Sequence, residues 1–214
     1  YFVQDEADIS LLGKLRAMGF RSVAPLYNED NALGGGAEGD PARGITPLGR
    51  SFMMSAWRRG FVVDCAHANH RTKAGMIDLA LVTGNAIHYS HGFLGEPVEK
   101  SFKERGLPRE EAERIFETGG LVGLTPHPGF VGTFERHLEE IDYLGALSEG
   151  QVVMGTDFAG TNRPGPAGNR MFDEFPGARG YQGFAGRLAE IHGENFARAF
   201  CGRTLRGYLE GALA

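Results

Sequence analysis

This sequence lacks several features that by themselves would indicate a class of function. The 214 residues include only two cysteines, Cys65 and Cys201, and their wide separation indicates neither a disulfide framework nor a cysteine zinc site. No apolar run approaches the ~20 residues that span a bilayer. Basic residues are few and scattered, and the net charge of −5 argues against a nucleic-acid partner.

Two common catalytic motifs are also absent. The glycines at positions 34–36 are not followed by the Lys-Ser/Thr pair of a phosphate-binding loop, so we expect a flexible loop there. Ser90 and His91 are adjacent, but no Gly-x-Ser-x-Gly turn surrounds them, which argues against a serine hydrolase.

What the sequence does contain is a regular alternation of strand and helix patterns. Its 42% hydrophobic and 23% charged residues are typical of a globular protein, and we expect one domain over residues 1–214. Apolar runs predict strands at residues 1–3, 22–27, 61–65, 86–90, 121–124 and 151–155. Helical spacing predicts helices at residues 9–18, 47–60, 73–82, 110–116, 134–147, 181–191 and 194–213.

This alternation predicts a parallel sheet covered by helices, either an open doubly wound sheet or a (β/α)8 barrel. An open sheet concentrates its ligand contacts at one switch point. Here polar residues follow almost every predicted strand, as on the active face of a barrel; they are Gln4, Tyr27, Asn28, His67, His91, His127 and Asp157. We therefore predict a TIM-type α/β barrel in which the chain covers about six βα units, with the first two upstream of Tyr1.

Two histidines stand out because each lies one or two residues beyond the end of a predicted strand, and the two strands are expected to be neighbours. His67 ends Asp64-Cys65-Ala66-His67, and His91 lies 24 residues later. Imidazoles commonly bind zinc, and Asp157, after a third strand, could ligate a metal or act as a base. The alternative is that these are hydrogen-bonded structural residues.

The remaining candidates have simpler explanations. Strand alternation points His88 away from His91 and into the core, and His137 lies among apolar helix positions, where a buried structural role is expected. Arg105 could bind a carboxylate through two hydrogen bonds, or it could be a solvated surface residue.

Taken together and in order, the motifs resemble the membrane dipeptidase (renal dipeptidase) family of zinc peptidases, peptidase family M19. The matching segments are LYNEDN at 26–31, GITPLGR at 44–50, VDCAH at 63–67, IHYSH at 87–91, RGL at 105–107, GGLVG at 119–123, HLEEID at 137–142, GTDFAG at 155–160 and ENFAR at 194–198. The resemblance implies a soluble amidohydrolase-like barrel of the bacterial cytoplasm or periplasm.

The same resemblance implies roles for individual residues. His67 and His91 match two histidines that hold one zinc ion of a binuclear pair, and Asp157 matches the aspartate that assists the attacking water. Arg105 matches the arginine that binds the terminal carboxylate of the substrate, with about three extra residues separating it from His91. The expected substrate is a dipeptide or other small amide, and a homodimer is the expected assembly.

Two site positions depart from the family pattern. Gln4 stands where the family has a glutamate that bridges the metals, and a neutral amide cannot bridge two cations as a carboxylate does. Tyr27, which is followed by Asn28, stands where the family has a substrate-contacting histidine. The presence of Gln4 and Tyr27 at these two positions resembles a bacterial branch of the family. The His-x-Asp pair of the other zinc belongs upstream of Tyr1, so the competing expectation is a diverged barrel that serves as a binding or accessory protein.

Overall fold

The computed structural model describes residues 3–148, 150–157, 172 and 180–213. Five of the six predicted strands are confirmed, each shorter than its apolar run: β1 (Ser22–Val23), β2 (Val62–Asp64), β3 (Ile87–His88), β4 (Val122–Leu124) and β5 (Val152–Met154). Most of the sixth, residues 1–3, lies outside the described residues, as does most of the loop predicted over residues 156–180. Val3 is described and is buried.

Helices follow the strands as the sequence predicts. They are η1 (Ala7–Ser10), α1 (Leu11–Ala17), α2 (Pro47–Arg58), α3 (His70–Thr83), η2 (Lys100–Arg105), α4 (Arg109–Glu117), α5 (Pro128–Val131), α6 (Phe134–Leu147), α7 (Tyr181–His192), α8 (Glu194–Arg198), η4 (Ala199–Arg203) and α9 (Thr204–Leu213). The side chains of Thr46, Asn69 and Thr133 cap α2, α3 and α6.

Helix α3 begins three residues before its apolar pattern because Asn69 accepts a hydrogen bond from the Thr72 N–H. The single helix predicted over residues 194–213 is wrong: it is divided into α8, a π-helical segment and α9, because Gly202 has non-helical backbone angles. The short helices η2 and α5 were not predicted.

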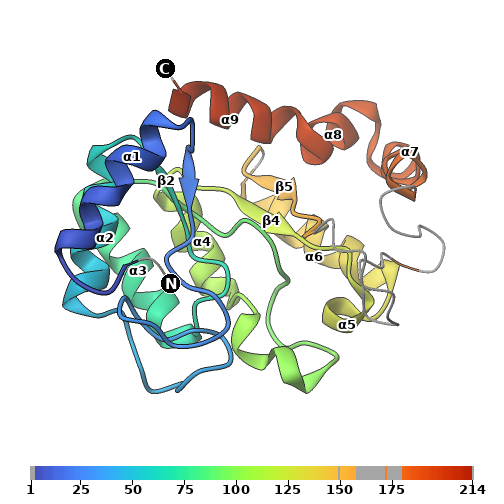
Figure 1. Ribbon diagram of the computed structural model, residues 1–214. Coiled ribbons are helices and arrows are strands. Elements are labelled where there is room, and N and C mark those ends of the chain that lie inside the picture. The colour runs from blue at the N-terminus through green and yellow to red at the C-terminus, as the bar shows by residue number, and fades with distance from the viewer. Residues whose placement is uncertain (1–2, 149, 158–171, 173–179, 214) are drawn as a thin grey trace.

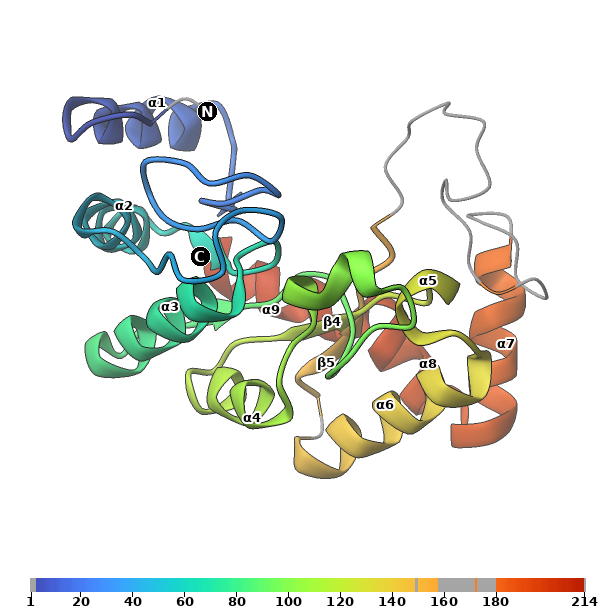
Figure 2. The same ribbon diagram turned by 90° about the horizontal axis from the view of Figure 1, so that it is seen from below.

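The described strands are parallel and follow one another in chain order. β1 pairs with β2, β2 with β3, and β4 with β5, while a parallel bridge from Tyr89 to Val122 joins β3 to β4. Helices α1, α2, α3, α4 and α6 form an arc along one side of these strands (Figure 1, Figure 2). A doubly wound sheet would reverse its strand order, so the unreversed order of these parallel strands is that of part of a (β/α)8 barrel, as predicted.

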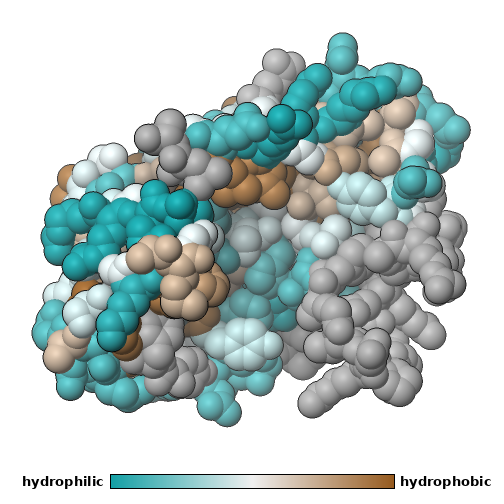
Figure 3. Space-filling model, turned by 45° about the horizontal axis from the view of Figure 1, so that its top comes forward, coloured by the Kyte–Doolittle hydropathy of each residue, from teal (hydrophilic) through white to brown (hydrophobic). Residues whose placement is uncertain are grey.

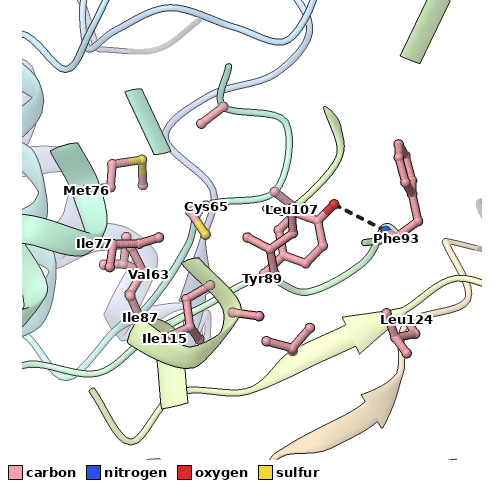
Figure 4. Packing of buried hydrophobic residues seen from close by; sticks show 14 of the residues in the cluster. Val63, Cys65, Met76, Ile77, Ile87, Tyr89, Phe93, Leu107, Ile115 and Leu124 are labelled. Carbon is pink, nitrogen blue, oxygen red and sulfur yellow. Dashed lines mark hydrogen bonds between the residues drawn. The ribbon is translucent and has the colours of Figure 1, made fainter. Parts of the chain in front are cut away.

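Alternate strand residues point toward the helices and form the main core. Val63, Ile87 and Val122 are completely buried, and Met76 of α3 and Ile115 of α4 are completely buried as well. Figure 4 shows these layers meeting, with Cys65 and Tyr89 at the end of the strands nearest the loops. Burial of each such side chain contributes about 1.5–3 kcal/mol, which fixes the strand register.

The other strand face meets the C-terminal helices. The His88 ring lies 5.9 Å from the Tyr208 ring of α9, and only 7% of His88 is exposed, so the prediction of a core position is confirmed. A cavity of about 1250 Å³ lies between the ends of α4 and α6 and the segment from α8 to α9. On the face seen in Figure 3, hydrophilic side chains dominate, with apolar side chains gathered near its upper middle.

His137 and Glu140 form a buried pair on α6. His137 is completely buried, as predicted, with its ring 5.8 Å from that of Phe184, and its Nδ1 lies 3.9 Å from Glu140 Oε2. Glu140 Oε1 accepts the Leu94 N–H (3.2 Å) and so ties α6 to the loop after β3. Burial lowers the pKa of His137 to about 3 and raises that of Glu140 to about 8.

The raised pKa of Glu140 predicts a specific loss of stability with pH. The folded chain holds this proton more tightly than the unfolded chain, so the stabilisation is complete below pH 4.5 and is lost as pH rises to about 8. Across that window, the unfolding free energy of the wild type should fall relative to Glu140→Gln by about 1–3 kcal/mol. Urea unfolding at a series of pH values measures this difference.

The exposed neighbour Glu139 provides the matched control, because Glu139→Gln removes the same charge from the same helix. The wild type and Glu139→Gln should show parallel stability curves. If the curves of Glu140→Gln and Glu139→Gln had the same shape, Glu140 would not carry the effect.

Candidate functional site

The ends of β2 and β3 bring His67 and His91 together, as the sequence predicts. Their Nε2 atoms are 3.0 Å apart, and their ring centroids are separated by 4.9 Å. His67 has a φ of 67°, a left-handed conformation that costs energy outside glycine and is common at functional sites. Tertiary packing therefore holds His67 in a conformation that turns its side chain toward the neighbouring strand.

A hydrogen-bonded chain from β2 fixes the orientation of the His91 ring. The Asp64 carboxylate accepts hydrogen bonds from Ala66 N–H, Ser90 N–H (both 3.0 Å) and the Ser90 hydroxyl (2.5 Å). Since that hydroxyl donates its only hydrogen to Asp64, its oxygen accepts from His91 Nδ1–H at 2.7 Å. His91 is therefore held with its Nε2 lone pair directed into the site.

Asn28 fixes His67 in the same way. The Asn28 amide nitrogen donates to Glu38 Oε1 (2.6 Å), which turns the amide oxygen toward His67 Nδ1 at 2.7 Å. His67 thus donates from Nδ1 and keeps its own lone pair on Nε2. The ring of Tyr27 covers His67 at a centroid distance of 4.4 Å.

The loop that carries Asn28 is packed, and the prediction of a flexible glycine segment is wrong. Residues 33–37 are buried. A Cβ on Gly36 would lie 2.4–2.5 Å from the carbonyl oxygens of Tyr27, Asn28 and Glu29, so only glycine allows this close approach. The glycine therefore supports the backbone that presents Tyr27 and Asn28 to the histidines.

Two lone pairs facing each other at 3.0 Å repel unless a cation or proton lies between them. Tetrahedral zinc with two nitrogen ligands at ~2.0–2.1 Å separates the nitrogens by about 3.3 Å, close to the observed distance. Burial, with the charge of Arg105, lowers the pKa of His67 to about 3, and burial lowers the pKa of His91. Both rings are thus neutral near pH 7, as metal ligation requires.

Asp157 and Arg105 complete the group that the structure brings together. His91 Nε2 is 3.8 Å from Asp157 Oδ1, and Arg105 Nη2 is 3.8 Å from Asp157 Oδ2. The Arg105 guanidinium lies 5.1 Å from the centre of the Phe130 ring. Asp157 has a positive φ of 51°. Within the described part of the chain, however, no group of three His, Cys, Asp or Glu residues is arranged to hold a metal ion.

Gln4 is the remaining residue for which the sequence predicts a place in the metal site. It is exposed at the start of the chain, and its N–H donates to Asp8 Oδ2 at 2.8 Å.

The sequence analysis assigned no role to Asp64 or Ser90. The available signal was a charged residue inside a buried apolar strand, because such a side chain needs polar partners nearby.

Comparison with known proteins assigns the family. The model of the family Membrane dipeptidase (Peptidase family M19) matches residues 4–173. The chain belongs to the membrane dipeptidase family. An uncharacterized Klebsiella pneumoniae protein in the pqqA 5' region is 25% identical over 170 residues, covering 72% of this chain and 60% of that protein.

Solved structures of similar proteins share the fold. An amidohydrolase from Pseudomonas aeruginosa matches with a TM-score of 0.77 at 21% identity, over 95% of this chain and 68% of its own. A metallo peptidase from Rhodobacter sphaeroides, liganded with a phosphinate mimic of the dipeptide L-Ala-D-Ala, matches with a TM-score of 0.75 at 24% identity, over 95% and 59%. The chain spans about 60% of the length of the Klebsiella pneumoniae relative described above.

The two hydrogen-bonded supports predict separable effects on the histidine tautomers. Ser90→Ala removes the acceptor of His91 Nδ1–H, so His91 should become a mixture of tautomers while His67 keeps its single form. Asn28→Ala should have the reciprocal effect on His67 alone. Nitrogen-15 NMR of the imidazoles in chelator-treated protein measures both, and a change in the other ring in each variant would contradict the assignment.

Proposed function

We propose that this chain carries part of the active site of a metal-dependent hydrolase that cleaves a dipeptide or a similar small amide. The observation that supports this most strongly is the pair of Nε2 lone pairs on His67 and His91, each fixed by an acceptor on the opposite ring nitrogen. Such second contacts are typical of metal-ligating histidines. We propose zinc as the metal, as one or two ions.

The protein residues divide the remaining work. His67 and His91 would hold the metal, and the resemblance to the family assigns Gln4 to the position of its bridging carboxylate. When bound, the metal supplies Lewis-acid chemistry that activates water near neutral pH and polarises a carbonyl. Asp157, 41% exposed and next to His91, would accept the proton of the attacking water.

Substrate contacts are proposed for three residues around the histidines. Arg105 would bind the terminal carboxylate, because its planar guanidinium offers two parallel donors. Tyr27 is 58% exposed beside His67 and offers an aromatic face, and Asn28 lies next to it.

No helix among the described residues is both long and apolar enough to cross a membrane.

A second candidate function is a barrel that has diverged into a binding or accessory protein. What favours it is the neutral side chain of Gln4, which the resemblance to the family assigns to the bridging position, because a neutral amide cannot bridge two cations as a carboxylate does. The retained pair of His67 and His91, with their orienting contacts, favours the hydrolase.

Metal binding separates the two functions. If the chain is a metal-dependent hydrolase, the wild-type protein should bind zinc near pH 7, and His67→Ala and His91→Ala should each lower the zinc affinity by more than about 100-fold. Isothermal titration with zinc, together with metal analysis of the purified protein, measures both. His192→Ala, which changes a partly buried histidine of α7 that is paired with Asp142 of α6, is the matched control.

Two results would argue against the proposal. If the wild type bound no zinc at neutral pH, the accessory function would be favoured. If zinc binding survived unchanged in both His67→Ala and His91→Ala, the metal site would lie elsewhere in the chain.

A further inference from the structure

A buried lysine lies behind the loop that carries Arg105. Lys73 of α3 is completely buried, and its Nζ donates to the Gly106 carbonyl at 2.6 Å and approaches the Arg105 carbonyl at 3.5 Å. Burying an ammonium costs several kcal/mol unless hydrogen bonds offset the lost hydration. Burial lowers the pKa of Lys73 to about 8, with opposing contributions from Glu111 and Glu104, so the ammonium form prevails near pH 7.

A buried tyrosine binds the same piece of main chain from β3. The Tyr89 hydroxyl donates to the Arg105 carbonyl at 2.6 Å and accepts the Phe93 N–H at 3.4 Å, the contact drawn in Figure 4. Lys73 Nζ lies 5.3 Å from the centre of the Tyr89 ring. The two side chains thus reach consecutive carbonyl groups from one buried cluster.

The residues that follow Arg105 are fixed as well. Leu107 N–H donates to the Phe93 carbonyl and Gly95 N–H to the Leu107 carbonyl, both at 2.9 Å. A Cβ on Gly106 would lie 2.1 Å from the Gly95 carbonyl oxygen, so the two segments are in close contact. The main chain at the end of η2 therefore has little freedom to rotate.

From this fixed main chain, the Arg105 side chain extends toward the His67–His91 site. Its side chain is only 11% exposed, and it reaches Asp157 at 3.8 Å while its guanidinium lies over Phe130. A long arginine has many rotamers, and ordering it costs up to about 2 kcal/mol of conformational entropy. Because the main chain at Arg105 is held in place, the guanidinium can take fewer positions.

We propose that Lys73 and Tyr89 are positioning residues: by holding the carbonyl groups of Arg105 and Gly106, they set the direction in which the Arg105 guanidinium enters the His67–His91 site. The consequence for carboxylate recognition rests on the proposed function, whereas the positioning itself does not. Neither residue is expected to touch the substrate.

The test compares Lys73→Met and Tyr89→Phe with Lys103→Met, which removes a charge from an exposed lysine of the same loop. The first readout is the Arg105 Nε–Hε NMR signal, assigned by its loss in Arg105→Lys. The second is the KM for hydrolysis of the dipeptide L-Ala-D-Ala and of its C-terminal amide. Tyr89→Phe removes only a hydroxyl, so it carries the test if Lys73→Met does not fold.

We expect Lys73→Met and Tyr89→Phe to shift or broaden the Arg105 signal and to raise the KM for the dipeptide by about 10-fold, with a small change in kcat. The KM for the amide and all properties of Lys103→Met should stay near those of the wild type. An unchanged Arg105 signal in both variants, or an equal rise in KM for dipeptide and amide, would overturn the proposal. If the signal moves but wild-type protein does not cleave the dipeptide, positioning stands and the proposed function fails.

Discussion

Parallel strands that end at the same edge impose the constraint on which the site depends. β2 and β3 are paired in register, with Asp64 opposite His88, so the residues that follow them emerge side by side. This geometry allows the Asp64 carboxylate to reach Ser90 on the next strand and, through its hydroxyl, His91. The hydrogen bonds then leave two imidazole lone pairs facing each other at 3.0 Å.

The surrounding structure compensates for the cost of that arrangement. Two neutral histidines, one with a strained backbone, are stabilised by acceptors on their outer nitrogens and by burial against the core. Hydrogen bonds join Asp64 to Ser90 and Ser90 to His91. The Ser90 hydroxyl lies between the carboxylate and the imidazole, and it donates its hydrogen to the carboxylate.

Other buried polar groups hold loops in place through their hydrogen bonds. Glu140 ties α6 to Leu94, and Lys73 and Tyr89 hold the carbonyl groups of Arg105 and Gly106. Each places a side chain donor or acceptor beneath a loop where secondary structure offers none, and an unsatisfied buried group would cost about 1–3 kcal/mol. The segment after β3 is thus held by buried side chains of α3, of α6 and of the end of β3.

The sequence by itself determined the strand and helix alternation, the barrel class and the approach of His67 to His91, because apolar periodicity and strand order depend on local pattern. It also predicted the core positions of His88 and His137. Only the tertiary structure decided the break at Gly202, the packed glycine segment and the partnership of Asp64, Ser90 and Asn28 with the two histidines. Those features depend on contacts between residues far apart in the chain, such as Asn28 and His67, which leave no periodic signal in the sequence.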